Sequence, residues 1–494
     1  MISYVLKNSE VKDNILIPKY YDPELYAEII GLANTHNLFL LGDLLDEGSV
    51  LVQSGHEIGK MAYGTGNIPF VRTSDISNWE IKTIPKQGIS QEIYELYATK
   101  EDVKPGDILL VRDGTYLIGT NCMITGMDIP MVFQSHILKF RVINSEVIDP
   151  YLLFLCLNTS LVQRQIKNMQ FTADIIDTLG CRYRELILPI PKSEKKRKEM
   201  IVAMSTAVET RVRYKAAIKQ MPLLIEQVLA SNSIEAIDDF FSRPINQILS
   251  GLVQDTTTLE FGGFSAFTLN SGRIANNIYL PKYYDPEIIT ILDNLKTSCE
   301  LKSIQDLITH GDIELSTGDE IGKMAYGTGN IPFVRTSDFS NWEIKADTKQ
   351  GVSEEIYNQY AKNEDVQAKD ILIVRDGTYL VGSSCIITEL DTKMLYCGGL
   401  IKIRVKDNGF INAYLLLGLL NSYIVKRQIR TKQFTRDVID TLGQRFKEVV
   451  IPIPKSTIIR KQISERISAI VNSRIEAREI ISTLSQVIVS TECS

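Results

Sequence analysis

Apolar residues follow two different patterns along the chain. Between about 38 and 143 they form short β-branched and aromatic runs, such as Ile68 to Val71, Asp107 to Arg112, Cys122 to Thr125 and Ile137 to Val142. Gly and Pro separate these runs, and short runs bounded by turn residues are typical of strands. We therefore expect a compact sheet or barrel-like domain in this part of the chain.

Helical spacing and turn signals complete this pattern. Residues 149 to 168 and 412 to 431 have the spacing of helices, and Asp149-Pro150 is a typical helix start. Asp113-Gly114 and Asp376-Gly377 lie between apolar segments, which predicts tight turns where Gly adopts a positive φ.

Two long segments have a stronger helical pattern. They cover about 194 to 230 and 457 to 492, and in the second one apolar residues recur every three or four positions with charges between them. These positions are Ile459, Ile463, Ile467, Ile470, Val471, Ile475 and Leu484. We expect the two helices to pack as an antiparallel coiled coil, on the order of 50 Å long, that separates two globular units.

The sequence matches itself at a single shift of 263 positions. Ile17 to Glu24 returns as Leu280 to Glu287, and Gly59 to Asp75 returns letter for letter as Gly322 to Asp338. Roughly half of the positions between 17 and 193 are identical to their equivalents. A period this long indicates a duplicated domain rather than a solenoid, whose repeats run to about 20 to 50 residues.

The repeat sets the expected domain boundaries. These are a first globular domain at 1–193, a long helix at 194–231, a unique connector at 232–263, a second globular domain at 264–456 and a second long helix at 457–494. Copy 1 denotes residues 1–231 and copy 2 residues 264–494. The expected fold class is α+β, with two mixed domains joined by the helix pair in pseudo-two-fold symmetry, which suits a ligand with two related halves such as duplex DNA.

Composition agrees with folded domains throughout. Hydrophobic residues make up 44% and charged residues 23% of the 494 positions, close to the globular average. The longest apolar stretches fall far short of the roughly 20 residues that cross a bilayer, and the first ten residues lack a leader pattern. We therefore expect a cytoplasmic protein without a membrane partner.

Charge and cysteine content limit the function. The net charge of -6 argues weakly against nucleic-acid binding, although a basic face can coexist with acidic surfaces for protein partners. The seven cysteines include no C-x-x-C pair, so neither a zinc site nor a disulfide framework is expected. Cys122 and its equivalent Cys385 are expected to be small core residues.

Several segments resemble catalytic motifs without meeting their requirements. Gly55 to Lys60 resembles a phosphate-binding loop, but the spacing between its glycines is too short. Met also follows the Lys, at the position where Ser or Thr would hold Mg²⁺. Gly64-Thr-Gly66 lacks the third glycine of a dinucleotide site. The four histidines do not fall at equivalent positions, and no adenine methyltransferase tetrapeptide is present. We expect no catalytic residue, metal or cofactor in this chain.

One acidic set leaves an enzymatic alternative open. Asp75 with Glu80 and Lys82, repeated as Asp338, Glu343 and Lys345, has the residue types of a metal-dependent nuclease. The alternative interpretation of these residues is that they lie on a solvated strand edge beside Trp79.

The duplicated motifs resemble one known family. Gly-Asn-Ile-Pro-Phe-Val-Arg-Thr-Ser-Asp, then Asp-Ile-Leu-x-Val-Arg-Asp-Gly-Thr, then Pro-Ile-Pro before a long helix, are similar to the specificity (S) subunits of type I restriction-modification systems. The resemblance covers essentially the whole chain. It implies two target recognition domains that each read half of a split DNA site, and helices that dock methyltransferase (M) subunits.

The resemblance also sets expectations for partners and chemistry. It implies double-stranded DNA as ligand, two M subunits as partners and an endonuclease (R) subunit as a further partner. The S-adenosylmethionine of the N6-adenine methylation would belong to the M subunits. Family members usually carry two dissimilar recognition domains, whereas these two are close to each other, so we expect a nearly palindromic bipartite target.

Candidate DNA-binding residues fall into two groups. The first is common to both copies: Lys60, Arg72, Arg112 and Tyr116, with the equivalents Lys323, Arg335, Arg375 and Tyr379. Arg forms bidentate contacts with phosphate or guanine, but an Arg shared by both copies also fits a structural ion pair with Asp75 or Asp113. The tyrosines would stack, touch phosphate or cap the sheet.

The second group lies where the copies differ. Phe133 to His136 becomes Tyr396 to Gly399, and Ser54 to His56 becomes Thr317 to Asp319. Gln pairs with adenine and His donates to guanine, so Gln134 and His136 are the sharper candidates for base contacts. Loop drift without function is the alternative.

Other function classes stay open at this stage. They are a recognition subunit of another phage-defence system, a self-sufficient Mg²⁺-dependent nuclease, and a protein-binding scaffold or DNA mimic. Salt-sensitive DNA binding would count against the last of these.

Overall fold

The structure is a computed structural model. It describes residues 6, 11–13, 15–114, 116–173, 176–254, 267–269, 272, 274–275, 277–377, 379–436 and 439–490. The chain divides into two compact units. Unit 1 comprises Met1–Ile81, Pro85–Glu209 and Ala477–Ser494, and unit 2 comprises Lys82–Ile84 and Thr210–Glu476.

Unit 1 contains most of the globular domain of copy 1. Its helices are α1 (Pro23–Gly31), α2 (Leu41–Asp46), α3 (Gln91–Glu101), α4 (Pro150–Leu157) and α5 (Ser160–Met169). Its strands are β1 (His36–Leu40), β2 (Val50–Ser54), β3 (Ile68–Val71), β4 (Ile76–Ser77), β5 (Glu80–Ile81), β6 (Gln87–Ile89), β7 (Ile108–Val111), β8 (Asn121–Met123), β9 (Val132–Phe133), β10 (Ile137–Val142), β11 (Phe171–Ala173), β12 (Ile176–Thr178) and β13 (Ile187–Pro191).

Two sheets form the centre of this domain. An antiparallel sheet has the order β2-β10-β7-β8, and a second sheet has the order β6-β3-β9 with β3 parallel to β9. Val71 and Phe133 from the second sheet share one buried cluster with Leu109 and Cys122 from the first. The predicted strand runs and the core position of Cys122 are thus confirmed.

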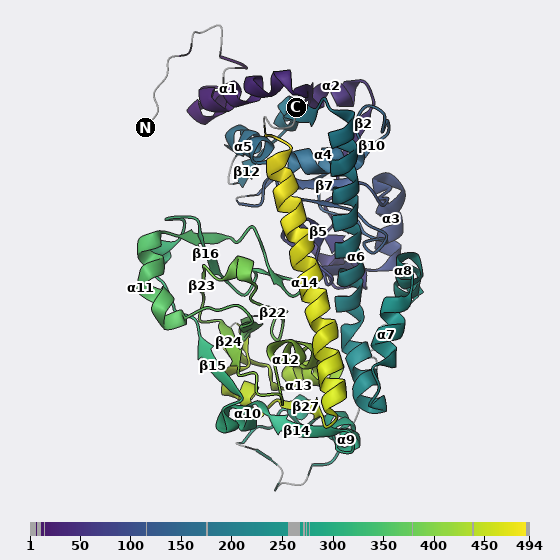
Figure 1. The fold of residues 1–494 in the computed structure, drawn as a ribbon, viewed down its shortest axis with the longest axis vertical. Coiled ribbons are helices and arrows are strands. Elements are labelled where there is room, and N and C mark those ends of the chain that lie inside the picture. Colours follow the sequence, from purple (N-terminus) through teal and green to yellow (C-terminus); the bar gives the residue numbers. More distant parts are fainter. Residues whose placement is uncertain are drawn as a thin grey trace. The chain divides into compact units, whose positions relative to one another are not determined.

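Unit 2 contains the same elements in the same order (Figure 1). Its helices are α9 (Pro286–Leu295), α10 (Ile304–His310), α11 (Glu354–Glu364), α12 (Ala413–Leu420) and α13 (Tyr423–Lys432). Its strands are β14 (Cys299–Ser303), β15 (Ile313–Thr317), β16 (Ile331–Val334), β17 (Phe339–Ser340), β18 (Glu343–Ile344), β19 (Gln350–Val352), β20 (Ile371–Val374), β21 (Asp376–Gly377), β22 (Ser384–Ile386), β23 (Leu395–Tyr396), β24 (Leu400–Val405), β25 (Phe434–Arg436), β26 (Ile439–Thr441) and β27 (Val450–Pro454).

The sheets of unit 2 repeat the topology of unit 1. The orders are β15-β24-β20-β22 and β19-β16-β23, again with one parallel pair, β16 with β23. Cys385 is completely buried, as predicted. The mixed α+β class expected for a duplicated domain is confirmed.

The two long helices each contribute to both units. Helix α6 (Glu194–Ser231) has the predicted extent, and in unit 1 its Met200 and Met204 share a core with Ala477 and Ile481 of α14 (Figure 1). Helix α14 begins as predicted at Thr457 but ends at Val487 instead of 492. The β-branched run at 487–489 has a low helix propensity, and the chain turns there; residues 491–494 lie outside the described part.

The predicted connector is partly helical. It carries α7 (Glu235–Ser242) and α8 (Ile245–Gln254), while its residues 255–263 lie outside the described part of the chain. In unit 2, Asp238 of α7 forms an ion pair with Arg466 of α14, 2.7 Å apart. The connector therefore packs on the helix pair, at least through its first helix.

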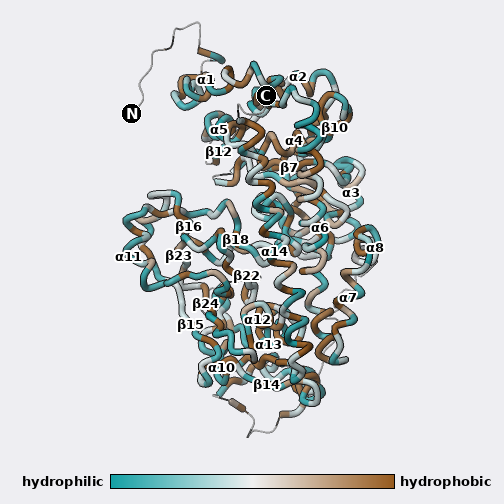
Figure 2. The backbone as a smooth tube through the Cα atoms, in the orientation of Figure 1, coloured by the Kyte–Doolittle hydropathy of each residue, from teal (hydrophilic) through white to brown (hydrophobic). Residues whose placement is uncertain are grey.

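The helix predicted at 149–168 is two helices. Asp149 caps α4 as expected, by accepting from the backbone N–H of Tyr151. The break follows from Thr159, whose backbone is extended and whose hydroxyl caps α5 by accepting from the N–H of Val162. Figure 2 shows α4 and its equivalent α12 as hydrophobic segments, in keeping with their burial.

The glycine turns have the predicted backbone. Gly114 and Gly377 adopt φ angles of 142° and 150°, a region that side chains rarely occupy. In unit 2 this turn pairs as β21 with β26, and in unit 1 Asp113 forms the equivalent bridge with Thr178. The turn therefore fixes the residue before it, Arg112 or Arg375, against the sheet.

Candidate nucleic-acid interface

Strand ends bring four of the predicted residues of copy 1 to one edge. Because β3 and β9 are parallel, with Val71 opposite Phe133, Arg72 and Gln134 follow at the same edge. The N–H of Gln134 donates to the carbonyl of Val71 at 2.9 Å. The N–H of Arg112 donates to the carbonyl of His136 at 2.8 Å, which adds the end of β7 to this edge.

An ion pair holds the arginine of this edge. Arg112 donates to Asp113 through both Nε and Nη2, at 3.1 and 2.8 Å, and Nδ1 of His136 lies 3.0 Å from the same carboxylate. Burial would raise the pKa of Asp113, but the hydrogen bonds from Arg112, Thr178 and His136 outweigh it and lower the pKa. The Arg112–Asp113 pair matches the structural role weighed for a shared arginine.

The same pair exists in copy 2. Arg375 donates to Asp376 through Nη2 at 2.7 Å, and Thr441 donates to the same carboxylate at 2.5 Å. Position 399, equivalent to His136, is Gly. The arginine–aspartate pair therefore persists without the histidine, which marks it as part of the common scaffold.

A cleft of about 1000 Å³ opens beside Arg375 in unit 2. Arg445 and Lys447 also line it, and Phe434 forms part of its apolar wall. Arg445 stacks on Phe434 at 4.0 Å and donates to the carbonyls of Lys432 and Thr441, so its position is fixed. A fixed cationic lining of this kind suits phosphate.

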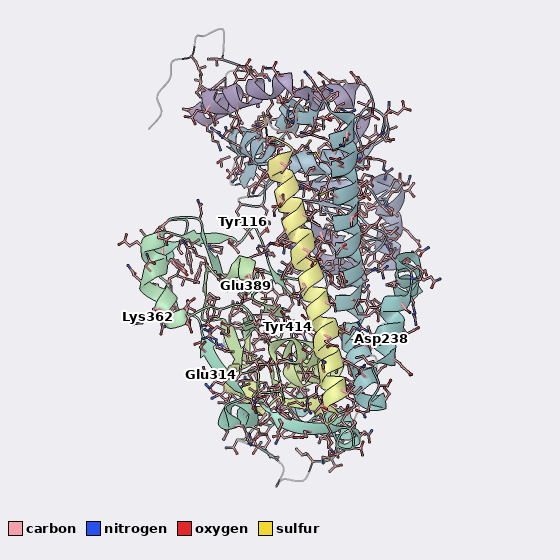
Figure 3. The ribbon with its side chains drawn as sticks, viewed as in Figure 1. Tyr116, Asp238, Glu314, Lys362, Glu389 and Tyr414 are labelled. Carbon is pink, nitrogen blue, oxygen red and sulfur yellow. The ribbon has the colours of Figure 1, made fainter. Side chains whose placement is uncertain are left out.

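The shared lysines and tyrosines lie on turns outside these strand ends, whereas Arg335 follows the equivalent strand end of copy 2. Lys60 and Lys323 are exposed on short 3₁₀ turns, Lys60–Ala62 and Lys323–Ala325. Tyr116 is 40% exposed (Figure 3), whereas Tyr379 is half-buried and lines a smaller cavity of about 260 Å³. The N–H of Arg335 donates to Asp338 at 2.9 Å, as that of Arg72 does to Asp75 at 3.0 Å.

Gln134 and His136, the two candidates for base contacts, differ in solvent exposure. Gln134 is only 7% exposed, whereas the side chain of His136 is 36% exposed. Gln134 is therefore buried, whereas the side chain of His136 is accessible from solvent. His136 is therefore the better placed of the two.

Sequence reasoning missed one residue at this edge, Glu101. It is completely buried at the end of α3, and Oε2 accepts from the N–H of Phe133 at 2.9 Å. The only sequence signal was its identity with Glu364 in copy 2, in a segment without a recognised motif.

The acidic set of the nuclease alternative is buried. Asp75 accepts from the backbone N–H groups of Arg72 and Lys86, and burial raises the pKa of its equivalent Asp338. In unit 2, Oε2 of Glu343 accepts from Nη2 of Arg211 at 2.9 Å and from Nε of Arg474 at 3.1 Å. A carboxylate bound to two arginines is a poor ligand for Mg²⁺, and the described residues contain no cluster of three or more metal-ligating side chains.

Among the helices described, none is both long and apolar enough to cross a membrane.

Comparison with known families identifies the domain. Residues 311–486 match the family described as the type I restriction modification DNA specificity domain, which confirms the resemblance seen in the motifs. Copy 1 is identical to copy 2 at roughly half of its positions, and its residues 48–223 are the equivalents of the matched region. The match itself covers residues 311–486 of copy 2.

Solved structures give looser matches. The S subunit of a type I restriction-modification system from M. genitalium is 11% identical, with 93% of this chain and 95% of that chain covered and a TM-score of 0.31. The HsdS subunit from Thermoanaerobacter tengcongensis is 15% identical, with 92% and 95% covered and a TM-score of 0.26. No curated protein matches the chain. The assignment therefore rests on the family match and the repeat.

Proposed function

We propose that this chain is the DNA specificity subunit of a type I restriction-modification complex and is not itself an enzyme. Each copy reads one half of a bipartite site in double-stranded DNA. The observation that carries this proposal is the specificity-domain match in copy 2 together with the duplication of that domain in copy 1. The clustering of Arg72, Arg112 and His136 at one edge supports it.

The two halves of the site are similar and inverted. Similar domains present similar surfaces, and two domains related by two-fold symmetry read a duplex in opposite directions. The high identity of the two copies supports similar half-sites, and the His136-to-Gly399 difference supports a limited departure from a perfect palindrome.

The helices dock the partners. Two methyltransferase (M) subunits bind along α6 and α14 and supply S-adenosylmethionine for N6-adenine methylation, and an endonuclease (R) subunit completes the complex. The complex acts on cytoplasmic DNA. The acidic balance of the chain then belongs to surfaces that face protein rather than DNA.

The test is methylation mapping. The chain is purified with its neighbouring methyltransferase, and methylated adenines are mapped across the genomes of cells with and without it. We expect one bipartite motif with two similar inverted halves that disappears with the chain. Methylation that does not depend on the chain would contradict the proposal.

A further inference from the structure

Two short loops are among the segments that differ between the copies. Loop A denotes residues 54–57 in copy 1 and 317–320 in copy 2, and loop B denotes 133–136 and 396–399. Residues 59–75, which lie between the two loops, are identical in the two copies. Loops A and B differ at positions 54, 56 and 133–136, six of the many positions at which the copies differ.

Loops A and B touch in both copies. In copy 1 the N–H of His56 donates to the carbonyl of Phe133 at 3.0 Å, and a Cβ added to Gly55 would lie 2.2 Å from that carbonyl oxygen. In copy 2 a Cβ added to Gly318 would lie 1.9 Å from the carbonyl oxygen of Tyr396. Only glycine permits this approach, so the two loops have one fixed relative position.

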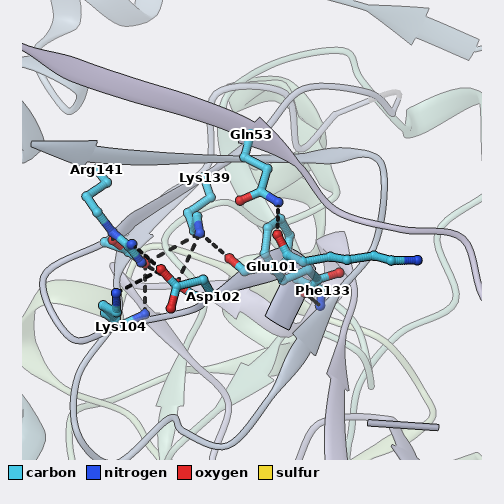
Figure 4. A network of polar contacts seen from close by, with 9 residues as sticks. Gln53, Glu101, Asp102, Lys104, Phe133, Lys139 and Arg141 are labelled. Carbon is cyan, nitrogen blue, oxygen red and sulfur yellow. Dashed lines mark hydrogen bonds and ion pairs between the residues drawn. The ribbon is translucent and has the colours of Figure 1, made fainter. Parts of the chain in front are cut away.

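A buried glutamate holds the two loops together. In copy 1, Oε1 of Glu101 lies 2.9 Å from Nδ1 of His56 in loop A, and Oε2 accepts from the N–H of Phe133 in loop B. Figure 4 shows Glu101 beside Phe133 and the neighbouring Lys139, whose Nζ donates to the carbonyl of Glu101. One carboxylate thus bridges the loops.

Copy 2 keeps the bridge while its loop residues change. Oε1 of Glu364 accepts from the N–H of Asp319 at 3.2 Å, and Oε2 accepts from the N–H of Tyr396 at 2.9 Å. Glu364 is 2% exposed. The partner in loop A is a side chain in copy 1 and a backbone N–H in copy 2, so the bridge is independent of the loop sequence.

This arrangement is costly in free energy and is nevertheless present in both copies. Burial raises the pKa of Glu101 and of Glu364 to about 7, against the hydrogen bonds that lower it. A neutral residue would avoid that penalty. The retained carboxylates are explained if they position the loops.

We infer that loops A and B of each copy form one composite reading element, and that Glu101 and Glu364 are its positioning residues and do not contact DNA. The inference rests on the proposed function, because it names the part of each specificity domain that sets the base preference. It predicts that the preference is transferred only when both loops are transferred together.

The experiment exchanges loops in the full chain bound to its methyltransferase. Loop A of copy 1 receives S54T and H56D, loop B receives F133Y, Q134C, S135G and H136G, and a third variant carries both sets. Bound sites are selected from random DNA. We expect the third variant to select the copy 2 half-site at both ends, and each single exchange to lose at least about tenfold in preference at half-site 1.

Two outcomes would overturn the inference: transfer of the preference by one loop alone, or an unchanged half-site 1 with both loops exchanged. Failure of the wild-type complex to select any sequence would instead overturn the proposed function, so the two failures are distinguishable.

A second measurement tests the positioning residues. We expect E101L to lose preference at half-site 1 and keep it at half-site 2, E364L to do the reverse, and E101Q to recover most of the loss because the amide still accepts from Phe133. Each Leu variant is a control for the other, since a general folding defect would affect both halves. Equal losses at both halves in each variant would overturn the role of the glutamates.

Discussion

The two copies of the domain share their buried charge pairs and differ in loops A and B. In copy 1, Arg141 binds Asp107 through Nε and Nη2 at 2.6 and 2.7 Å (Figure 4), and in copy 2 Arg404 binds Asp370 through the same atoms at 2.8 Å. Loops A and B, by contrast, differ in most of their residues. The comparison separates an ion-pair scaffold that both copies share from two adjacent loops whose residues differ.

Arg112 and Arg375 belong to the scaffold in this comparison. Each is paired with the next residue, Asp113 or Asp376, whatever follows in loop B. We propose that a paired arginine of this kind contacts phosphate or holds the turn, and that the base preference depends on neighbours such as His136. The difference between the copies is therefore a better guide to base contacts than their identity.

The largest expected effect comes from breaking the scaffold in one copy. R141A leaves the buried Asp107 carboxylate without its guanidinium and should destabilise unit 1 by about 3 kcal/mol, with R404A doing the same in unit 2. Hydrogen exchange of the backbone amides of β7 and β20 would show which unit has lost stability in each variant. K104A, which removes only an exposed partner of Asp102, should change stability by less than about 1 kcal/mol. Equal loss with K104A would contradict this account.

The next effect comes from forcing the loops apart. G55A or G318A places a Cβ against a backbone carbonyl, which should cost about 2 kcal/mol in strain and reduce binding to the corresponding half-site more than tenfold. G59A and G322A are matched controls, because nothing lies within 4 Å of an added Cβ there. Binding to DNA with one half-site randomised at a time measures the effect. A weaker effect of G55A than of G59A would refute the fixed loop contact.

A smaller effect is expected in the pH dependence of stability. The folded pKa of Glu101 is about 7, above its unfolded value, so the folded chain holds this proton while the unfolded chain releases it as pH rises. Wild-type stability should therefore fall relative to E101Q between about pH 4.5 and 7, and the difference should stay constant above pH 7.

Thermal unfolding at pH 5, 6, 7 and 8 measures this difference. His56 and Lys139 also face Glu101, so E364Q is compared in parallel, where Asp319 replaces His56. E92Q, at an exposed position of the same helix, is the control. If the stability advantage of E101Q over the wild type became smaller as pH rises, the sign would be wrong for a buried carboxylate with a raised pKa.

The smallest expected effect comes from the exposed lysines that both copies share, Lys60 and Lys323. K60A and K323A should weaken binding to all sequences alike and reduce the slope of log affinity against log salt by about 1 each, if each lysine contacts one phosphate. Titrations at several salt concentrations measure the slope. A change in base preference with an unchanged slope would assign these lysines to base contacts instead.

The sequence predicted the parts of the fold that depend on local pattern. The strand at 68–71, the turns at Gly114 and Gly377 and the start of α6 follow from residue spacing and from glycine chemistry. The break after α4 was not predicted, because Thr159 competes with the helix through a hydroxyl cap that apolar spacing does not reveal.

The candidate site was predicted in part for a similar reason. The repeat indicated which positions change, but the role of Glu101 depends on contacts with residues 45 and 32 positions away, at His56 and Phe133. The burial of Gln134 likewise follows from strand pairing between β3 and β9. Neither contact is encoded by a local motif.

The central claim is that two similar specificity domains read two similar half-sites. The most direct test is selection of binding sites from random duplex DNA by the chain purified with its methyltransferase. The account predicts one bipartite site whose halves are inverted and differ at few positions. Two unrelated half-sites, or no selected sequence, would contradict it.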